Sequence, residues 1–250
     1  MSAPCDLRAS VTSNKIFPED YILQAIKLGY KTIAVDQTIT LAQLEKVHGK
    51  FQFPVIQAPQ SFLDKLSKLE GGSSVKILSR VTVEYSAQTR FHKQIKPALE
   101  KFDIIAARPQ DDKALERLLD EEIDIISLDG GLKSAYFLKK ELIKKVMVKD
   151  LVFELEYAPC VSDSSVMGNT IQLAQDLLTF CKGKNLILSS GHSNPLYIRG
   201  PYDVINLAVL FGLPTNLAKE TVFGGALNVV KYAEGRKSLS VNIDINQRKV

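Results

Sequence analysis

Seven short runs rich in β-branched and other apolar residues recur along this chain of 250 residues, and most are separated by a segment with helical character. Residues 32–36 (TIAVD) show the type, because a continuous run of this kind is typical of a strand buried on both faces. The runs begin at Cys5, Thr32, Ile77, Ile104, Asp124, Leu151 and Asn185. Strands that alternate with helices become parallel neighbours joined by right-handed crossovers. The pattern therefore predicts an α/β fold: we favour a (β/α) TIM-barrel-like domain, with a doubly wound open sheet as the alternative.

Residues 181–214 join a buried strand, a polar loop and an apolar helix in that order. The strand ends in two serines, and the loop then leads to Arg199. Gly200 and Pro201 open the helix. Proline is favourable at the first helical position because the N–H that it lacks would have no intrahelical hydrogen-bond partner there. Polar and basic groups thus gather at the carboxyl end of a strand, where ligands bind in α/β folds.

The composition predicts one domain. No Pro-, Gly- or Ser-rich linker divides the chain, and 45% of its residues are hydrophobic, which is enough to bury one large core. We expect a barrel domain over residues 1–237 and a C-terminal tail, residues 238–250, that is flexible or adds a strand. The net charge of +4 is mildly basic and by itself is weak evidence for a nucleic-acid partner.

Cysteine usage and the lack of targeting features predict a soluble intracellular protein. Cys5, Cys160 and Cys181 are odd in number and far apart, which favours a reducing compartment over a disulfide framework or a structural zinc site. The first residues do not resemble a targeting segment, and the longest apolar run, 205–213, is too short to span a bilayer.

The histidines do not indicate a metal-dependent hydrolase. His48, His92 and His192 show no H-x-H or H-x-x-x-H spacing, and only His192 directly follows a predicted strand. Ser190 lies close to His192 in sequence, but the sharp G-x-S-x-G turn of a nucleophile elbow is missing. We therefore expect no metal ligands and interpret residues 189–192 as a polar loop.

Two acids on one predicted strand leave two interpretations open. Glu154 and Glu156 are two residues apart and so lie on the same face of the strand. They could form an acid–base pair. Alternatively, one or both are hydrogen-bonded to inward-facing basic groups such as Arg80 or Arg8.

Basic side chains indicate where RNA could bind. A helix predicted over residues 133–145 carries lysines opposite its apolar stripe, and a second basic set surrounds residues 181–214. Such a helix face is usually only solvated, but it can also contact a phosphate backbone. Interleaved aromatic residues that stack unpaired bases are absent, so we expect contacts to backbone and shape. The candidate RNA or partner contacts are Arg80, Lys133, Lys140, Lys144, Lys182, Lys184 and Arg199.

The run IRGPYD at residues 198–203 is a specific motif, and shorter matches to the same family recur in order over nearly the whole chain. The shorter matches include 6–8 (DLR), 28–30 (LGY), 76–78 (KIL), 102–106 (FDIIA), 153–155 (FEL), 181–185 (CKGKN) and 210–213 (LFGL). On these residues the sequence resembles the thirty-kilodalton protein subunit of ribonuclease P and ribonuclease MRP.

The resemblance implies a TIM-barrel-like fold related to the polymerase-and-histidinol-phosphatase metal hydrolases, without their metal ligands. It implies a non-catalytic subunit of a nuclear and nucleolar ribonucleoprotein whose RNA matures the 5′ end of precursor tRNA. Expected partners are that catalytic RNA, a small ferredoxin-like subunit and other holoenzyme proteins, with precursor tRNA bound indirectly and no membrane. This chain would bind no cofactor, while the RNA would need magnesium. The resemblance also carries over Arg80, Lys184 and Arg199 as RNA or partner contacts.

The alternative function is a stand-alone barrel hydrolase acting on a phosphate ester. It would use Glu154, Glu156 and His192, and turnover by the pure protein without RNA would distinguish it from the ribonucleoprotein subunit.

Overall fold

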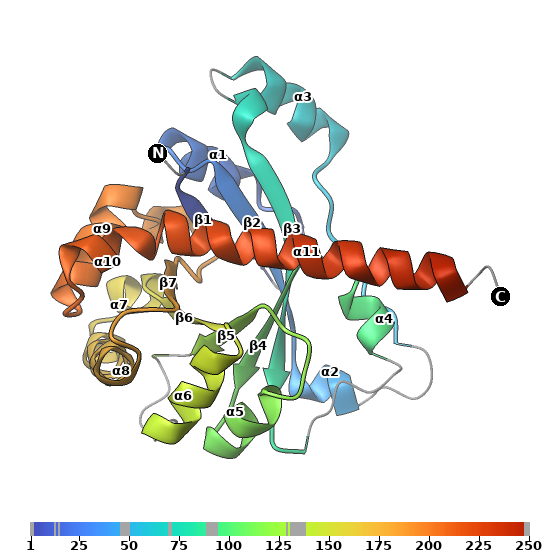
Figure 1. Ribbon diagram of the computed structural model, residues 1–250. Coiled ribbons are helices and arrows are strands. Elements are labelled where there is room, and N and C mark those ends of the chain that lie inside the picture. Colours follow the sequence, from blue (N-terminus) through green and yellow to red (C-terminus); the bar gives the residue numbers. More distant parts are fainter. Residues whose placement is uncertain are drawn as a thin grey trace.

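The computed structural model of the protein describes residues 3–12, 14, 16–45, 51–69, 72–88, 95–128, 130 and 139–247, and only the backbone of residues 45 and 239–247. Seven parallel strands form one sheet, which curls into a nearly closed barrel (Figure 1). They are Cys5–Ser10 (β1), Thr32–Ile39 (β2), Lys76–Tyr85 (β3), Ile104–Pro109 (β4), Ile125–Leu128 (β5), Val152–Glu156 (β6) and Leu186–Ser189 (β7). Each begins within one residue of its predicted start, so the barrel prediction is confirmed.

The strand order distinguishes the barrel from a doubly wound sheet. The strands are neighbours in the order of the sequence, β1 to β7, and every pair is parallel. A doubly wound sheet has a point at which the order reverses and the helices change face. Within this sheet there is no such point, and the helices lie outside the barrel (Figure 1).

Helices between the strands follow local capping rules. Asp111 Oδ1 accepts a hydrogen bond from Ala114 N at 2.7 Å and starts α5, as a preferred N-cap residue does. Pro201 occupies the first turn of α9. The helices are Glu19–Lys27 (α1), Leu41–Glu45 (α2), Gln60–Lys68 (α3), Lys96–Leu99 (α4), Asp112–Leu118 (α5), Lys140–Val148 (α6), Ala158–Ser162 (α7), Ser164–Cys181 (α8), Pro201–Leu210 (α9), Thr215–Glu220 (α10) and Gly224–Gln247 (α11), with 3₁₀ turns at Gly72–Ser74 (η1) and Pro195–Tyr197 (η2). Among the described residues, none of these helices is both long and apolar enough to cross a membrane.

Pro97 lies in the first turn of α4, where proline is tolerated. Two other segments differ from the sequence prediction. The helix expected over 133–145 is described as α6, Lys140–Val148, and its earlier part lies outside the described residues. The backbone of α11 stays helical past position 238 to Gln247, so the tail adds no strand there.

α11 crosses the amino-terminal end of the barrel and closes it (Figure 1). Ala226, Val229, Val230 and Ala233 of α11 pack against side chains from the first half of the strands. Those strand residues are Cys5, Leu7, Ala34, Leu78, Ile104, Ala106, Ile125 and Ile187. Burial of these apolar side chains stabilises the closed end of the barrel. The active ends of the strands in TIM-type folds are the opposite, carboxyl ends.

The barrel is closed between β7 and β1 by side chains and isolated backbone bonds rather than by a full ladder. The Asp6 carboxylate accepts a bond from Ser190 N at 3.0 Å. The carbonyl of Arg8 accepts bonds from Ser190 Oγ at 2.9 Å and from Gly191 N at 3.1 Å. A single bridge then joins Ala9 to His192. On the other side of β1, its pairing with β2 shifts register between Asp6 and Ala9.

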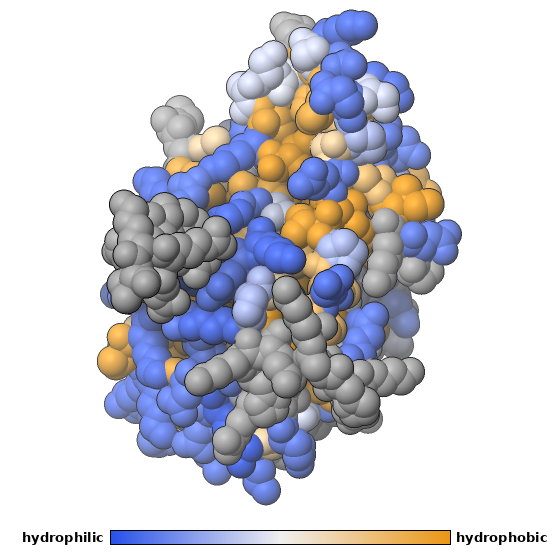
Figure 2. Space-filling view, turned by 90° about the vertical axis from the view of Figure 1, so that its right-hand side faces the viewer, coloured by the Kyte–Doolittle hydropathy of each residue, from blue (hydrophilic) through white to orange (hydrophobic). Residues whose placement is uncertain are grey.

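The side of the molecule that carries α3 and α4 shows hydrophilic side chains around a smaller apolar area (Figure 2). The segment that leads to α3 contributes stacked rings, since the centroids of Phe51 and Phe53 lie 6.1 Å apart. Phe53 in turn packs on Phe102 of the core. This segment therefore extends the hydrophobic core outwards from the barrel.

We predict that Gly191→Ala destabilises the protein by about 1–3 kcal/mol. Gly191 has φ +68°, and a Cβ there would lie only 2.5 Å from Glu156 Oε2 and 2.8 Å from its Cβ. Urea unfolding of the purified protein measures the effect. Gly168→Ala is the control, because no atom beyond the adjoining backbone of helix α8 and its two neighbouring residues lies within 4 Å of its added Cβ, and it should be neutral or stabilising by up to about 1 kcal/mol. Equal stability of the two variants would contradict this account of the seam.

Candidate functional site

The interior of the barrel changes from apolar to polar along the strands. In six strands an inward apolar residue is followed two positions later by a polar one, as side-chain alternation requires for residues on one face. The pairs are Ala34 and Asp36, Leu78 and Arg80, Ala106 and Arg108, Ile125 and Ser127, Val152 and Glu154, and Ile187 and Ser189. The polar members of these pairs, together with Arg8 and Glu156, form a layer that is here called the ionic layer. It contains three arginines and three carboxylates.

Arg80 and Glu154 form the centre of the ionic layer. Arg80 Nη1 and Nη2 each donate a hydrogen bond of 2.6 Å to one oxygen of the Glu154 carboxylate. Both side chains are 0% exposed. Arg80 Nη1 also donates to the carbonyl of Leu7 at 2.7 Å. Burial alone would raise the pKa of Glu154, but the Arg80 guanidinium outweighs it and lowers that pKa from 4.5 to about 2. The pair is therefore ionised and bidentate, which is the strong geometry for two buried charges.

Arg8 and Arg108 hold the remaining carboxylates of the layer. Arg8 forms an ion pair with Asp36, with Nε and Oδ2 3.2 Å apart but without hydrogen-bond geometry, and a second pair with Glu156. Arg8 Nη1 also donates to Ser127 Oγ at 2.6 Å. Arg108, which is closer to the surface, donates to the same Glu156 oxygen. The second interpretation of Glu154 and Glu156, in which arginines hold both carboxylates, is confirmed.

A group of buried tyrosines fixes the loop after β7. Tyr21 donates to Asp6 Oδ2 at 2.7 Å, and its hydroxyl also contacts Ser190 Oγ, which ties α1 to the seam of the barrel. Tyr30 donates to the carbonyl of Arg199 at 3.0 Å, and Tyr157 accepts a bond from Arg199 N at 3.1 Å. Burial raises the pKa of all three phenols well above the usual value, so they remain protonated and able to donate.

The predicted contact residues do not form one cluster. Lys182 and Lys184 are exposed in the turn between α8 and β7, at the amino-terminal end of the barrel. Arg199 is half-buried beyond the opposite end of β7 and donates to the carbonyls of Leu196 and Ile198. Lys140 and Lys144 are exposed on the outer face of α6, which packs beside α8.

Arg80 and Lys133 differ from the other predicted contact residues. Arg80 is enclosed by the ionic layer and leaves no surface for RNA or protein to touch, so we assign it to the interior. Lys133 lies outside the described residues.

The three residues that the alternative hydrolase function would use form hydrogen bonds or ion pairs within the protein. Glu154 and Glu156 are held by arginines, and His192 Nδ1 accepts a bond from Asn194 N at 2.9 Å. The His192 ring packs edge-on against Tyr197, and burial lowers its pKa. In the part of the chain that the structure describes, no three His, Cys, Asp or Glu side chains come together as a metal-binding group.

Comparison with known proteins identifies the family. The sequence model of the family described as RNase P subunit p30 matches residues 3–238. The chain belongs to this family. Ribonuclease P protein subunit p30 of Mus musculus is 29% identical over 242 residues, which cover 95% of this chain and 88% of the mouse protein. The probable ribonuclease P protein subunit 3 of Schizosaccharomyces pombe is 29% identical over 212 residues, 84% of each chain.

Solved structures support the fold of this p30-family chain. A chain in the structure of archaeal ribonuclease P with mature tRNA superposes with a TM-score of 0.66 at 14% identity, over 92% of this chain and 91% of that one. Histidinol phosphate phosphatase from Lactococcus lactis gives a TM-score of 0.54 at 14% identity, over 85% and 95% of the two chains. At these identities the likeness concerns the fold, and the expected relation to metal hydrolase barrels is confirmed at that level.

We predict that Glu154→Gln destabilises the protein at pH 7 by about 3–5 kcal/mol, because it removes the bidentate partner of Arg80 and leaves the buried ionic layer with one positive charge in excess. A carboxyl with a lowered folded-state pKa stabilises the fold above its unfolded pKa and loses that contribution as the pH falls. Wild-type stability should therefore decrease between pH 4.5 and about 2, and the variant should lose this part of the slope. Urea unfolding across this range measures it, with exposed Asp64→Asn as the control. Parallel pH profiles of wild type and Glu154→Gln would contradict the assignment.

Proposed function

We propose that this chain is a non-catalytic protein subunit of ribonuclease P, in which an RNA matures the 5′ end of precursor tRNA. The observation that carries the proposal is the match of the p30 subunit family to residues 3–238, nearly the whole chain. Relatives of similar length in mouse and fission yeast bear the names of ribonuclease P subunits. The function of the chain is then to stabilise the active RNA and to bind partner subunits.

The interior chemistry agrees with a supporting role. General acid–base catalysis needs a carboxyl that can exchange a proton with a substrate within hydrogen-bond reach. Both oxygens of Glu154 are bound by Arg80, and the lowered pKa keeps the group ionised at neutral pH. The residues of the proposed hydrolase thus support the barrel, and no observation favours that second function.

We further propose which surfaces meet the RNA and the partner proteins. Lys140 and Lys144 on α6, Lys182 and Lys184 before β7, and Arg199 in the loop after β7 supply the positive charges. A small ferredoxin-like subunit and other holoenzyme proteins complete the complex, and precursor tRNA is bound indirectly. We extend the proposal to ribonuclease MRP and to a nuclear and nucleolar location. The magnesium that the RNA needs would be held by the RNA, since arginines occupy the interior carboxylates.

Affinity purification of the tagged protein tests the function. Its bound RNA is sequenced, and the eluate is assayed on precursor tRNA with and without prior nuclease treatment. We expect one structured RNA and a 5′ cleavage activity that nuclease abolishes. An eluate without RNA, or an activity that survives nuclease, would overturn the proposal.

We predict that Lys140→Ala/Lys144→Ala weakens binding of the RNA to the reconstituted holoenzyme and lowers its salt dependence. Each phosphate contact that is lost reduces the slope of log K against log [salt] by about 0.7–0.9. The measurement is RNA affinity at several salt concentrations. Lys65→Ala/Lys68→Ala on α3 is the matched control, since it removes the same charge from another exposed helix face. Identical slopes for both variants would show that α6 is not part of the RNA-binding surface.

A further inference from the structure

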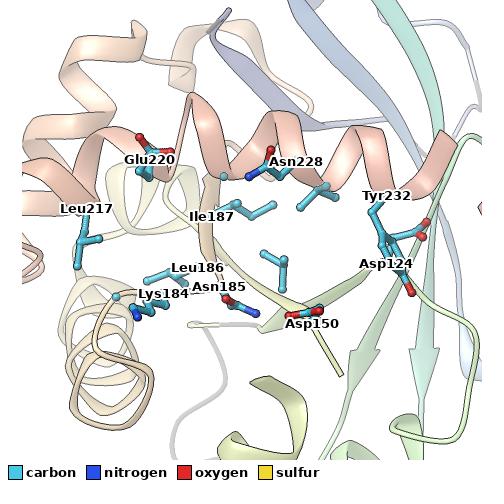
Figure 3. A pocket seen from close by; sticks show the side chains of 14 residues that line it. Asp124, Asp150, Lys184, Asn185, Leu186, Ile187, Leu217, Glu220, Asn228 and Tyr232 are labelled. Carbon is cyan, nitrogen blue, oxygen red and sulfur yellow. The ribbon is translucent and has the colours of Figure 1, made fainter. Parts of the chain in front are cut away.

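A cleft of about 450 Å³ lies at the amino-terminal end of the barrel, between α11 and the turns that precede β6 and β7 (Figure 3). Its size is in the range of specific binding pockets, about 300–1,000 Å³. The polar residues of the ionic layer and the loop after β7 lie toward the carboxyl ends of the strands, at the other end of the barrel. The cleft is therefore separate from the ionic layer and from the loop after β7.

The floor of the cleft is apolar. Val152 and Leu186 come from the starts of β6 and β7, Ile187 follows, and Val229 of α11 and Leu217 of α10 complete it. On α11 the residues that line the cleft are Gly225, Asn228, Val229 and Tyr232, which follow the spacing of one helix face. This face is adjacent to the one that plugs the barrel, so its position is fixed by the core.

The rim of the cleft has more acidic than basic groups. Asp150 and Glu220 are exposed carboxylates for which the structure gives no ion pair or hydrogen bond to the described residues. A third carboxylate, Asp124, is buried and is held bidentately by Arg236, with bonds of 2.8 and 2.9 Å. Lys184 is the one lysine or arginine among the lining residues. Two uncompensated negative charges thus face one positive charge in a chain whose net charge is +4.

Tyr232 provides an aromatic surface at the edge of the cleft. Its side chain is 52% exposed and lies at the end near Asp124, as Figure 3 shows. A guanidinium or ammonium group over such a ring gains a cation–π attraction, and arginine also stacks on it. An arginine or lysine stem would meanwhile cover the apolar floor and keep its charged end at the acidic rim.

We propose that this cleft binds a basic side chain, arginine above all, from a polypeptide segment of another subunit in the holoenzyme. Charge complementarity favours a basic polypeptide over RNA, because the phosphates of RNA would face Asp150 and Glu220. Arginine is enriched among the residues that contribute most to protein interfaces. The proposal rests on membership of the complex and adds a docking site for a protein partner to it.

Site-specific crosslinking in the assembled complex tests the proposal. Tyr232→benzoylphenylalanine is introduced into the tagged full-length chain, the complex is purified and irradiated, and the crosslinked species is identified by mass spectrometry. We expect a crosslink to a peptide of another subunit with arginine or lysine at or next to the attachment site. A crosslink to RNA, to a second copy of this chain or to a peptide without a basic residue, or no crosslink, would overturn it.

Charge variants in the same crosslinking background give the quantitative test. Asp150→Asn/Glu220→Gln should lower the crosslink yield by about tenfold, the effect of losing one charge-assisted contact. Asparagine is chosen because residue 150 has φ +54°, a conformation that it tolerates. The matched control, Asp20→Asn/Asp64→Asn, removes two exposed carboxylates elsewhere and should leave the yield unchanged. An undiminished yield in Asp150→Asn/Glu220→Gln would contradict the proposed electrostatics.

A filling variant tests the cavity itself. Asn228→Trp places a large ring in the cleft, while Lys231→Trp places the same ring on another exposed position of α11. Only the first should abolish the crosslink. RNA content and precursor-tRNA cleavage are measured in every sample, so a complex that is active but shows no crosslink refutes the docking site alone. Absence of RNA and of cleavage in the unsubstituted complex would instead refute the proposed function.

Discussion

The bidentate pair between Arg80 and Glu154 is the interaction on which the interior of this barrel depends. Two ionised groups that are fully removed from water are tolerable only when their hydrogen bonds are satisfied. Arg80 meets this condition through the two oxygens of Glu154 and the carbonyl of Leu7. Asp36 and Glu156 are balanced in turn by Arg8 and Arg108, so the formal charges of the layer cancel. The polar interior of the barrel is thus internally neutralised, and its ion pairs join strands that are far apart in the sequence.

The rest of the architecture places working surfaces around this neutral interior. α11 plugs the amino-terminal end of the barrel and also forms one wall of the acidic cleft. At the other end, the Tyr30 and Tyr157 hydroxyls hold the backbone of Arg199, and Asp6 holds the seam from which the same loop departs. The loop that carries Arg199 and the cleft with the acidic rim thus lie at opposite ends of β7, in positions that the core fixes.

The strand pattern and the IRGPYD motif made the barrel and the family predictable, because alternation of buried runs with helices and a contiguous motif are local properties of sequence. Most of the ionic layer was harder to predict from the sequence. An apolar residue followed two positions later by a polar one recurs in six strands, and this signal could have located Asp36, Arg108 and Ser127. Which arginine pairs with which carboxylate depends on barrel closure and stagger, so the bidentate geometry that encloses Arg80 is not visible in the sequence. Asp6 and the tyrosines were missed for the same reason: their partners lie up to 184 positions away.

The measurement that tests the scaffold interpretation most directly is precursor-tRNA cleavage by a holoenzyme reconstituted with Arg80→Met/Glu154→Leu. Replacing a buried ion pair by apolar side chains of similar size is often neutral for stability. We therefore predict a folded chain, normal RNA content and cleavage at the wild-type rate. A complete and folded complex whose cleavage falls by about a hundredfold or more, the size of a general acid–base contribution, would show that the pair takes part in the chemistry.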